Sequence, residues 1–452
     1  MAIARRKFLK YASSSLVGST LLNSCQGDRA DPSRPNIVVL IADDLRWDCL
    51  GRFNKIIQTP NLDRLGDRGT VYLNNFVTTS ICPTSRASIF TGLYARNHGI
   101  WDFETDLNKK QWQQTYHHLL KKAGYDLAFV GKWGVGNKPP QKKFDYWAGF
   151  AEQGNYYTED RQEHLTSYLT SQAEDFIQQE NNNFCLTISY KAPHVDEDPY
   201  DPFIPDKKFA QQYKNITIPR LGNPQDASFL PKFLQHTEAQ KRYNWRFKSD
   251  KQYQKSVKNY YRLISGIDES VGRIITAVKQ RNFIQDTYII FTSDNGFFLG
   301  EKGLAGKWFG FEAAIKTPLI IANLDRPLST PGTIDEMSLN IDLAPTILSL
   351  AQIKPQAELF QGKNIYPQQQ NPRQWFFYEH FYRHPDIHIP DNLGIRSLRY
   401  KYLLFPQYDF EMLFDLQQDS VENHNLAQNK DYQEKVQYYR RLAQESARQL
   451  KG

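Results

Sequence analysis

The chain has 452 residues, of which 40% are hydrophobic and 23% are charged, a composition typical of a soluble globular protein. Its formal net charge is +7, and four of the positive charges lie within the first ten residues, so the remainder is only mildly basic. This balance excludes a typical nucleic-acid binder. The four cysteines have no metal-finger spacing, which argues against a zinc or disulfide framework.

The N-terminus has the pattern of a targeting segment. A basic stretch with the pair Arg5 and Arg6 is followed by a weakly apolar run over residues 11–22. That run is shorter than the about 20 apolar residues needed to span a bilayer, so it resembles a cleaved signal of the twin-arginine type. Residues 22–25 resemble a lipobox ending at Cys25. We therefore expect an exported bacterial protein in the periplasm or at the cell surface, whose only membrane contact is a lipid anchor at Cys25.

The first predicted strand covers residues 36–42, a continuous apolar run typical of a parallel strand buried on both faces. Asp43 and Asp44 follow directly at its carboxyl end, where α/β sheets collect their ligands. Two adjacent carboxylates repel each other, and a bound cation would relieve this repulsion. Taken alone, the pair is equally typical of a helix cap.

Strands and helices then alternate along the chain. Strands are predicted at 71–78, 127–130, 184–189, 288–292 and 319–322, and helices at 85–93, 115–123, 257–280 and 343–350. This alternation predicts an α/β fold, with a large mostly parallel sheet between layers of helices. Residues 198–249 are rich in proline and polar residues and are predicted to form an insertion or arm.

The pattern changes after about residue 365. Strands at 375–381, 398–404 and 412–415 and a helix at 432–450 predict a small α+β domain with an antiparallel sheet. We therefore expect three parts: a signal and tether at 1–33, a large α/β domain at 34–364, and a C-terminal α+β subdomain at 365–452.

Polar residues recur where the predicted strands end, and together they form a recognisable series. The set is Asp43, Asp44, Cys82, Lys132, His194, Asp294, Asn295 and Lys307. With their flanking residues they resemble, in order, the motifs of the arylsulfatase-type sulfatases of the alkaline phosphatase superfamily. The resemblance rests on segments 34–44, 79–92, 131–133, 192–194, 293–296, 306–308 and 342–346. It covers nearly everything after residue 34 and implies an alkaline phosphatase-like fold and sulfatase activity.

The resemblance also implies a role for each of these residues. Asp43, Asp44, Asp294, Asn295 and the modified Cys82 would bind Ca²⁺, a cation that prefers oxygen ligands. A maturation enzyme would oxidise Cys82 to formylglycine, whose hydrate would attack the sulfur of a sulfate ester. Arg86 would support the modified residue, and Lys132 and Lys307 would hold the sulfate oxygens. His194 would protonate the leaving alcohol.

Two positions depart from the family pattern. Thr84 stands where the signature usually has proline or alanine, and Pro83 comes one residue early, which puts the maturation of Cys82 in question. Gly134 stands where the family usually has a histidine that contacts the formylglycine hydrate. His98, in a neighbouring segment, is a candidate replacement by position, although a structural role is the competing interpretation.

The C-terminal region has a polar, aromatic and basic cluster that includes His380, Arg383, His384 and Arg396. Such a cluster would suit a sulfated carbohydrate, although it is equally typical of a polar loop between strands. Two alternatives remain open. One is a phosphodiesterase or phosphonate monoester hydrolase of the same superfamily, because a fold does not determine its chemistry. The other is a weakly catalytic lipoprotein that binds sulfated glycans.

Overall fold

The computed structural model describes residues 34–179, 183–196, 201–221, 230–281, 287–325, 332–354, 357–367 and 371–450. The predicted signal, the twin arginines and Cys25 lie outside these residues. Within them, no helix combines the length and the apolar character needed to cross a membrane.

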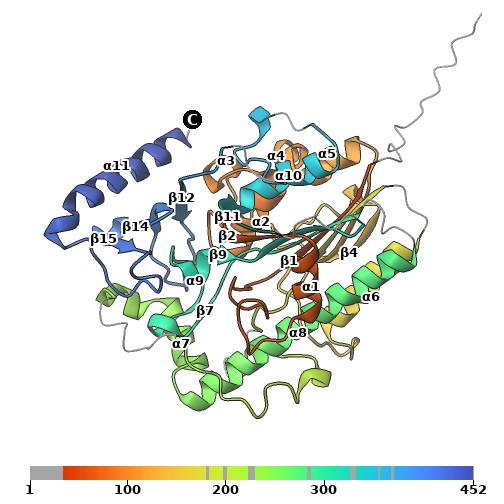
Figure 1. Cartoon of the computed structure of the whole chain (residues 1–452), viewed down its shortest axis with the longest axis horizontal. Coiled ribbons are helices and arrows are strands. Elements are labelled where there is room, and N and C mark those ends of the chain that lie inside the picture. The colour runs from red at the N-terminus through yellow and green to blue at the C-terminus, as the bar shows by residue number, and fades with distance from the viewer. Residues whose placement is uncertain are drawn as a thin grey trace, which may run out of the picture.

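A nine-stranded sheet runs through the larger part of the molecule (Figure 1). Its strand order is β11-β2-β10-β6-β1-β5-β3-β4, with β9 paired to β2. β1 is parallel to both of its neighbours, whereas β10 is antiparallel to β2 and β6. The strands are β1 (Asn36–Ala42), β2 (Thr70–Phe76), β3 (Asp126–Lys132), β4 (Tyr146–Phe150), β5 (Phe184–Ser189), β6 (Thr287–Ser293), β9 (Lys316–Thr317), β10 (Leu319–Asn323) and β11 (Gly332–Leu339). The predicted α/β class is confirmed.

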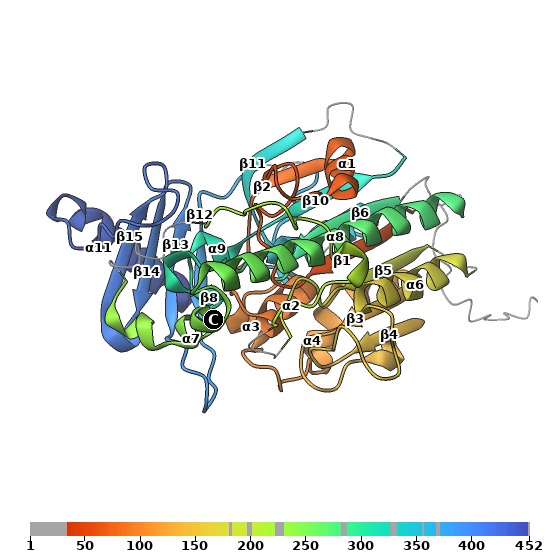
Figure 2. The ribbon, with the colours of Figure 1, turned by 90° about the horizontal axis from the view of Figure 1, so that it is seen from below.

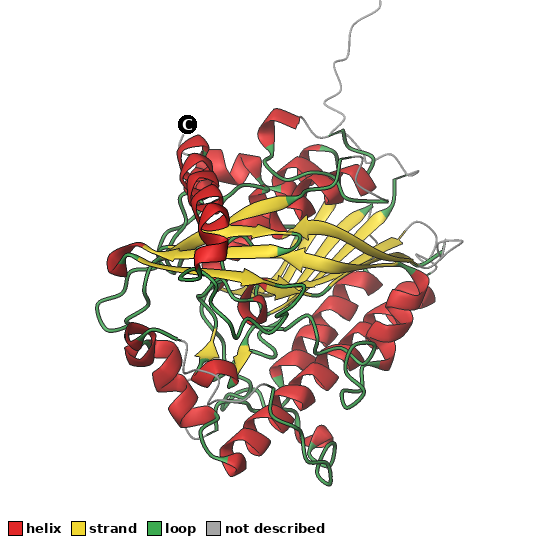
Figure 3. Ribbon diagram, turned by 60° about the vertical axis from the view of Figure 1, so that its left-hand side comes forward, coloured by secondary structure: helices red, strands yellow, loops and turns green. Residues whose placement is uncertain are grey.

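Helices cover both faces of this sheet because alternate residues of the buried strands point in opposite directions. From β1, Ile37, Val39 and Ile41 pack toward α2 (Cys82–Thr91), α5 (Tyr116–Lys122) and α10 (Leu343–Leu350). Val38 and Leu40 pack toward α1 (Pro60–Arg68), α6 (Leu165–Gln178) and α8 (Asp250–Gln280). Figure 3 shows the strands between these two helical layers. The buried β1 therefore ends in the middle of the molecule, where Asp43 and Asp44 follow.

The smaller sheet is antiparallel, as predicted, with the order β12-β13-β14-β15. Its strands are β12 (Trp375–His380), β13 (Asn392–Ser397), β14 (Tyr400–Phe405) and β15 (Phe410–Asp415), and α11 (Gln433–Gln449) lies beside them (Figure 2). β13 was not predicted, because Asn392, Gly394 and Arg396 interrupt its apolar character. The boundary after residue 364 stays a prediction, since the small sheet itself begins at Trp375.

The two sheets are joined by a shared core. Phe76 and Trp308 from the large domain pack in one cluster with Phe376, Tyr378 and Leu403 from the small sheet. The same cluster includes residues of β7 (Phe298–Leu299), which pairs with β8 (Ala305–Gly306), and of α9 (Glu312–Ile315). The remaining helices are α3 (Ala95–His98), α4 (Lys109–Gln114) and α7 (Glu238–Arg246). α7 lies in the predicted arm, and the strands β4 and β11 were not predicted.

Candidate active site

The carboxyl ends of β1 and β6 bring two pairs of polar residues together. The register pairs Ala42 with Ser293, so the residues that follow each strand are neighbours. The backbone N–H of Asp44 donates to Asp294 Oδ1 at 3.2 Å, and Asn295 Nδ2 donates to Asp44 Oδ1. Asp43, Asp44, Asp294 and Asn295 are all buried. Four oxygen-bearing side chains thus meet at one point of the sheet edge.

Cys82 lies beside these residues at the first position of α2, three residues earlier than the predicted start of this helix. Its Sγ is 3.3 Å from Asp43 Oδ1 and 2.8 Å from Lys307 Nζ. Burial, together with the negative charge of Asp43, raises the pKa of the Cys82 thiol despite the nearby lysines. The unmodified thiol is therefore protonated at neutral pH and is a poor nucleophile.

The donor set fits a hard divalent cation. Ligand atoms of Asp43, Asp44, Cys82 and His194 lie within 4.8 Å of one another. Asn295 Oδ1 is buried and accepts no hydrogen bond from the described residues. Burial, reinforced by the charges of Asp43 and Asp294, raises the pKa of Asp44 to about 6 although Lys307 opposes the shift. A bound cation would relieve this crowding of carboxylates and would give Asn295 Oδ1 a partner.

Arg86 holds two of the acidic residues in place by hydrogen bonds. Its Nε donates to Asp294 Oδ2 at 2.8 Å, Nη2 to Asp43 Oδ2 at 3.2 Å, and Nη1 to the carbonyl of Lys132 at 2.7 Å. Nη1 also donates to Ser189 Oγ. The side chain is fully buried, so its charge depends on these partners. Arg86 therefore connects the ends of β1, β3, β5 and β6 and fixes the positions of the residues that follow them.

Two lysines reach the cluster from different elements: Lys132 ends β3, and Lys307 directly follows β8. Lys307 Nζ is 2.5 Å from Asp44 Oδ1, and Lys132 Nζ donates to Asp43 Oδ2. Lys132 Nζ also donates to Gln153 Oε1 at 2.6 Å. Sequence reasoning missed Gln153, because it follows β4, a strand that the pattern did not predict. Two buried ammonium groups beside Cys82 suit the oxygens of a tetrahedral anion.

His194 presents one ring nitrogen to the cluster. Its Nδ1 donates to the carbonyl of Val195 at 2.7 Å, which leaves Nε2, at 3.6 Å from Asp44 Oδ2, directed to the site. Tyr156 holds the backbone by donating its hydroxyl to the His194 carbonyl at 2.6 Å. Burial lowers the pKa of His194 well below its usual range. A proton placed on Nε2 is therefore readily given up to a leaving group.

The position of the missing family histidine has no room for a side chain. Gly134 has a φ of +71°, and a Cβ atom there would lie 2.7 Å from Cδ of Arg86. His98 does not replace it. Its ring nitrogens are occupied by Ser88 Oγ and the N–H of Ile100, both at 3.0 Å, and burial lowers its pKa to about 3. These contacts favour a structural role for His98, and a role in the site stays a prediction.

The four C-terminal candidates lie in three different places. His380 ends β12 and is fully buried, with no hydrogen-bond partner for either ring nitrogen among the described residues. Arg383 is 65% exposed and pairs with Asp391. The ring of the neighbouring His384 stacks against Tyr382. These three positions stay predictions.

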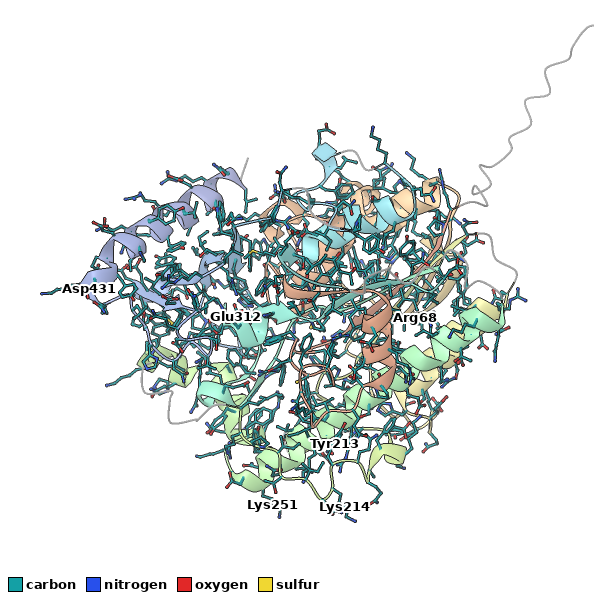
Figure 4. The ribbon with its side chains drawn as sticks, in the orientation of Figure 1. Arg68, Tyr213, Lys214, Lys251, Glu312 and Asp431 are labelled. Carbon is teal, nitrogen blue, oxygen red and sulfur yellow. The ribbon has the colours of Figure 1, made fainter. Side chains whose placement is uncertain are left out.

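Arg396 lies on β13 of the small sheet. It pairs with Glu312 at 3.2 Å and lines a separate cavity of about 710 Å³ together with Trp47 and Lys316. Glu312, labelled in Figure 4, lies between the two sheets. A buried ion pair therefore occupies the side chain of Arg396, and its role in binding substrate stays a prediction.

Comparisons with known proteins agree with this arrangement. The family model described as Sulfatase matches residues 35–353, and one described as N-sulphoglucosamine sulphohydrolase, C-terminal, matches residues 300–449. An N-acetylglucosamine-6-O-sulfatase from Bacteroides thetaiotaomicron is 27% identical over 96% of this chain and 90% of its own length. A choline-sulfatase from Rhizobium meliloti is 26% identical over 88% of this chain and 83% of its own length.

Solved structures are similar over nearly the whole length. A protein in complex with its substrate D-glucosamine-2-N,6-O-disulfate has a TM-score of 0.82 at 25% identity, covering 93% of this chain and 98% of that chain. The phosphonate monoester hydrolase of Agrobacterium radiobacter has a TM-score of 0.77 at 20% identity, covering 92% and 96%, a likeness of fold alone. Because the Sulfatase model covers well over half of the residues, this chain belongs to the sulfatase family and is a sulfuric ester hydrolase.

Proposed function

We propose that this enzyme hydrolyses a sulfate ester on a sulfated amino sugar, using formylglycine made from Cys82 and a bound Ca²⁺. The observation that carries the proposal is the position of Cys82. Its Sγ lies in a buried cluster, 2.8 Å from Lys307 Nζ and 3.3 Å from Asp43 Oδ1. A thiol with a raised pKa is of little use there, whereas an oxygen nucleophile at the same position would face the ester.

Asp43, Asp44, Asp294 and Asn295 would hold the Ca²⁺. Formylglycine at position 82 and a Ca²⁺ held there would supply an oxygen nucleophile and a Lewis acid for the sulfate ester. Binding of the sulfate oxygens and proton transfer are assigned to side chains of the protein. Lys132 and Lys307 bind the sulfate oxygens and offset their negative charge without having to reorganise.

Proton transfer to the leaving group is assigned to His194. Because Nδ1 is committed to the Val195 carbonyl, Nε2 is the atom that carries a proton to the leaving sugar oxygen. Arg86 acts indirectly, since its bonds to Asp43 and Asp294 orient the oxygens that would hold the cation. No imidazole can be added at Gly134, because Arg86 fills the space above it.

The amino-sugar substrate is inferred from similar proteins. One relative is named an N-acetylglucosamine-6-O-sulfatase, and one similar structure holds a disulfated glucosamine. The test compares hydrolysis of N-acetylglucosamine-6-sulfate, an aryl sulfate and an aryl phosphonate monoester by enzyme that was produced together with a maturation enzyme. Sugar-sulfate hydrolysis that is lost in Cys82→Ala supports the proposal. Faster cleavage of the phosphonate ester would favour the phosphoryl-transfer alternative, and binding without turnover would favour the glycan-binding alternative.

The maturation of Cys82 needs its own test, because Thr84 departs from the usual signature. Mass spectrometry of the Cys82 peptide should show an aldehyde in place of the thiol. Thr84→Ala, which restores the usual signature, serves as the comparison and should be converted at least as completely. A thiol in both proteins, together with hydrolysis by both, would refute the formylglycine mechanism.

Export and lipid anchoring are proposed from residues 1–33 alone. Arg5→Lys combined with Arg6→Lys should retain the protein in the cytoplasm, and Cys25→Ala should move it from the membrane fraction to the soluble fraction. Unchanged fractionation of both variants would refute this part of the proposal.

A further inference from the structure

Trp308, the residue after Lys307, has an unusual backbone conformation. Its φ is +81°, in the left-handed region that a bulky aromatic residue rarely occupies. Such a conformation costs free energy and persists only where the surrounding structure enforces it. The residue is also buried, with 4% of its surface exposed. We therefore expect the contacts of Trp308 to hold its backbone in this conformation.

Hydrogen bonds from three separate segments hold the peptide groups of Trp308. Its N–H donates to the carbonyl of Ser80 at 3.1 Å, in the loop that leads into Cys82. Its carbonyl accepts two hydrogen bonds from the small sheet, one from the Tyr378 hydroxyl at 2.9 Å and one from Asn392 Nδ2 at 3.1 Å. Two donors on one buried carbonyl leave it little freedom to rotate.

Asn392 makes a second contact with the same turn. Its Oδ1 accepts from the N–H of Gly310 at 3.1 Å, so one side-chain amide bridges Trp308 and Gly310. Only a group with a donor and an acceptor can make both bonds, which gives asparagine a specific use here. Tyr378 and Asn392 are both almost fully buried and come from neighbouring strands, β12 and β13.

We propose that Tyr378 and Asn392 are positioning residues, through which the small sheet aims Lys307 at the reacting sulfate. The reach of a lysine side chain depends on the direction of its Cα–Cβ bond, which the conformation of the surrounding backbone determines. Ser80 holds the peptide between Lys307 and Trp308, and Tyr378 and Asn392 hold the next peptide, between Trp308 and Phe309. By fixing the conformation of Trp308, the two residues hold the turn that keeps Lys307 Nζ 2.8 Å from Cys82 Sγ and 2.5 Å from Asp44 Oδ1. The inference rests on the proposed role of Lys307 in binding sulfate, and it gives the small sheet a part in catalysis.

The test uses the matured, full-length enzyme and two conservative variants. Tyr378→Phe keeps the ring and removes only the hydroxyl. Asn392→Asp keeps the acceptor for Gly310 and removes the donor to Trp308. Asn425→Ala is the matched control, because Asn425 bridges Leu413, Ala427 and Glu411 in the same small domain by similar amide bonds, away from Lys307.

Both test variants should lower kcat by about 10- to 100-fold, because small misplacement of a catalytic group has effects of that size. The KM should change less than kcat, and the control should stay within about twofold of the wild type. All proteins are compared well below their melting temperatures, so loss of folded protein does not enter. An unchanged kcat in Tyr378→Phe and Asn392→Asp, or an equal loss in Asn425→Ala, would overturn the inference.

A second measurement separates this inference from the proposed substrate. The dissociation constant of inorganic sulfate, measured by calorimetry with Ca²⁺ present, reports on Lys307 without any turnover. Both test variants should bind sulfate about tenfold more weakly than the wild type and the Asn425→Ala control. Wild-type protein that binds sulfate but cleaves no sugar sulfate would refute the proposed substrate alone, whereas equal sulfate binding by all four proteins would refute the positioning role.

Discussion

A substitution at Gly134 tests how closely the Arg86 side chain packs against the backbone of this glycine. Gly134→Ala places a methyl group 2.7 Å from Cδ and 3.1 Å from Nε of Arg86, and it also imposes a φ of +71° on alanine. The left-handed conformation costs about 1–2 kcal/mol. Displacing Arg86 weakens its charged bond to Asp294, which adds about 1.5–3 kcal/mol. The free energy of unfolding should therefore fall by about 2.5–5 kcal/mol.

A matched glycine separates the two contributions. Gly99 has the same φ of +71°, but nothing lies within 4 Å of the position of an added Cβ. Gly99→Ala should thus lose only the about 1–2 kcal/mol of conformational cost. Urea unfolding of both variants measures the difference, and sulfatase assays should show a loss of activity in Gly134→Ala only. Gly134→His, which restores the usual family residue, should also lose activity. Equal destabilisation by the two alanine variants would refute the packing argument.

Three further outcomes follow from the described contacts. Chelation of Ca²⁺ should lower the melting temperature, because saturation at about a hundredfold excess over Kd stabilises the native state by about 2.7 kcal/mol; an unchanged melting temperature would contradict the metal assignment. Asp268→Ala should lower the free energy of unfolding in urea by about 1–3 kcal/mol, since Asp268 accepts from the N–H groups of Asn61 and Leu62 at the start of α1. Burial opposes the ionisation of Glu312, but its buried cationic partners outweigh burial and keep the pKa of Glu312 below its ordinary value of 4.5. The ionised Glu312 side chain therefore stabilises the fold above the ordinary pKa, and this stabilisation is lost as the pH falls toward the lower pKa of the folded state. The difference in free energy of unfolding between the wild type and Glu312→Gln should shrink between about pH 6 and about pH 3. A difference that stays constant with pH in urea titrations would contradict this prediction.

Much of the fold and the chemical character of the site could be predicted from local patterns. The apolar run before Asp43 indicated a strand buried on both faces, and the parallel sheet that it implied is confirmed, together with the family. Strand-end polar residues such as Asp294 could be grouped because the carboxyl ends of parallel strands meet at one edge. β4, β11 and β13 escaped prediction because glycine or charged residues weaken their apolar pattern, as Arg396 does in β13.

Chain order and residue type by themselves determined which side chains we predict for the site: Cys82, Lys132, His194, Lys307 and the four acidic and amide residues. Only the tertiary structure decided which other residues contact that site. In the structure Arg396 forms an ion pair with Glu312, and the Arg86 side chain packs against Gly134. The fold also brings Tyr378 and Asn392 to the carbonyl of Trp308, which lies 70 and 84 residues earlier in the chain. The physical reason is that periodicity reports which face of an element is buried, whereas contacts between distant side chains depend on sheet register and packing.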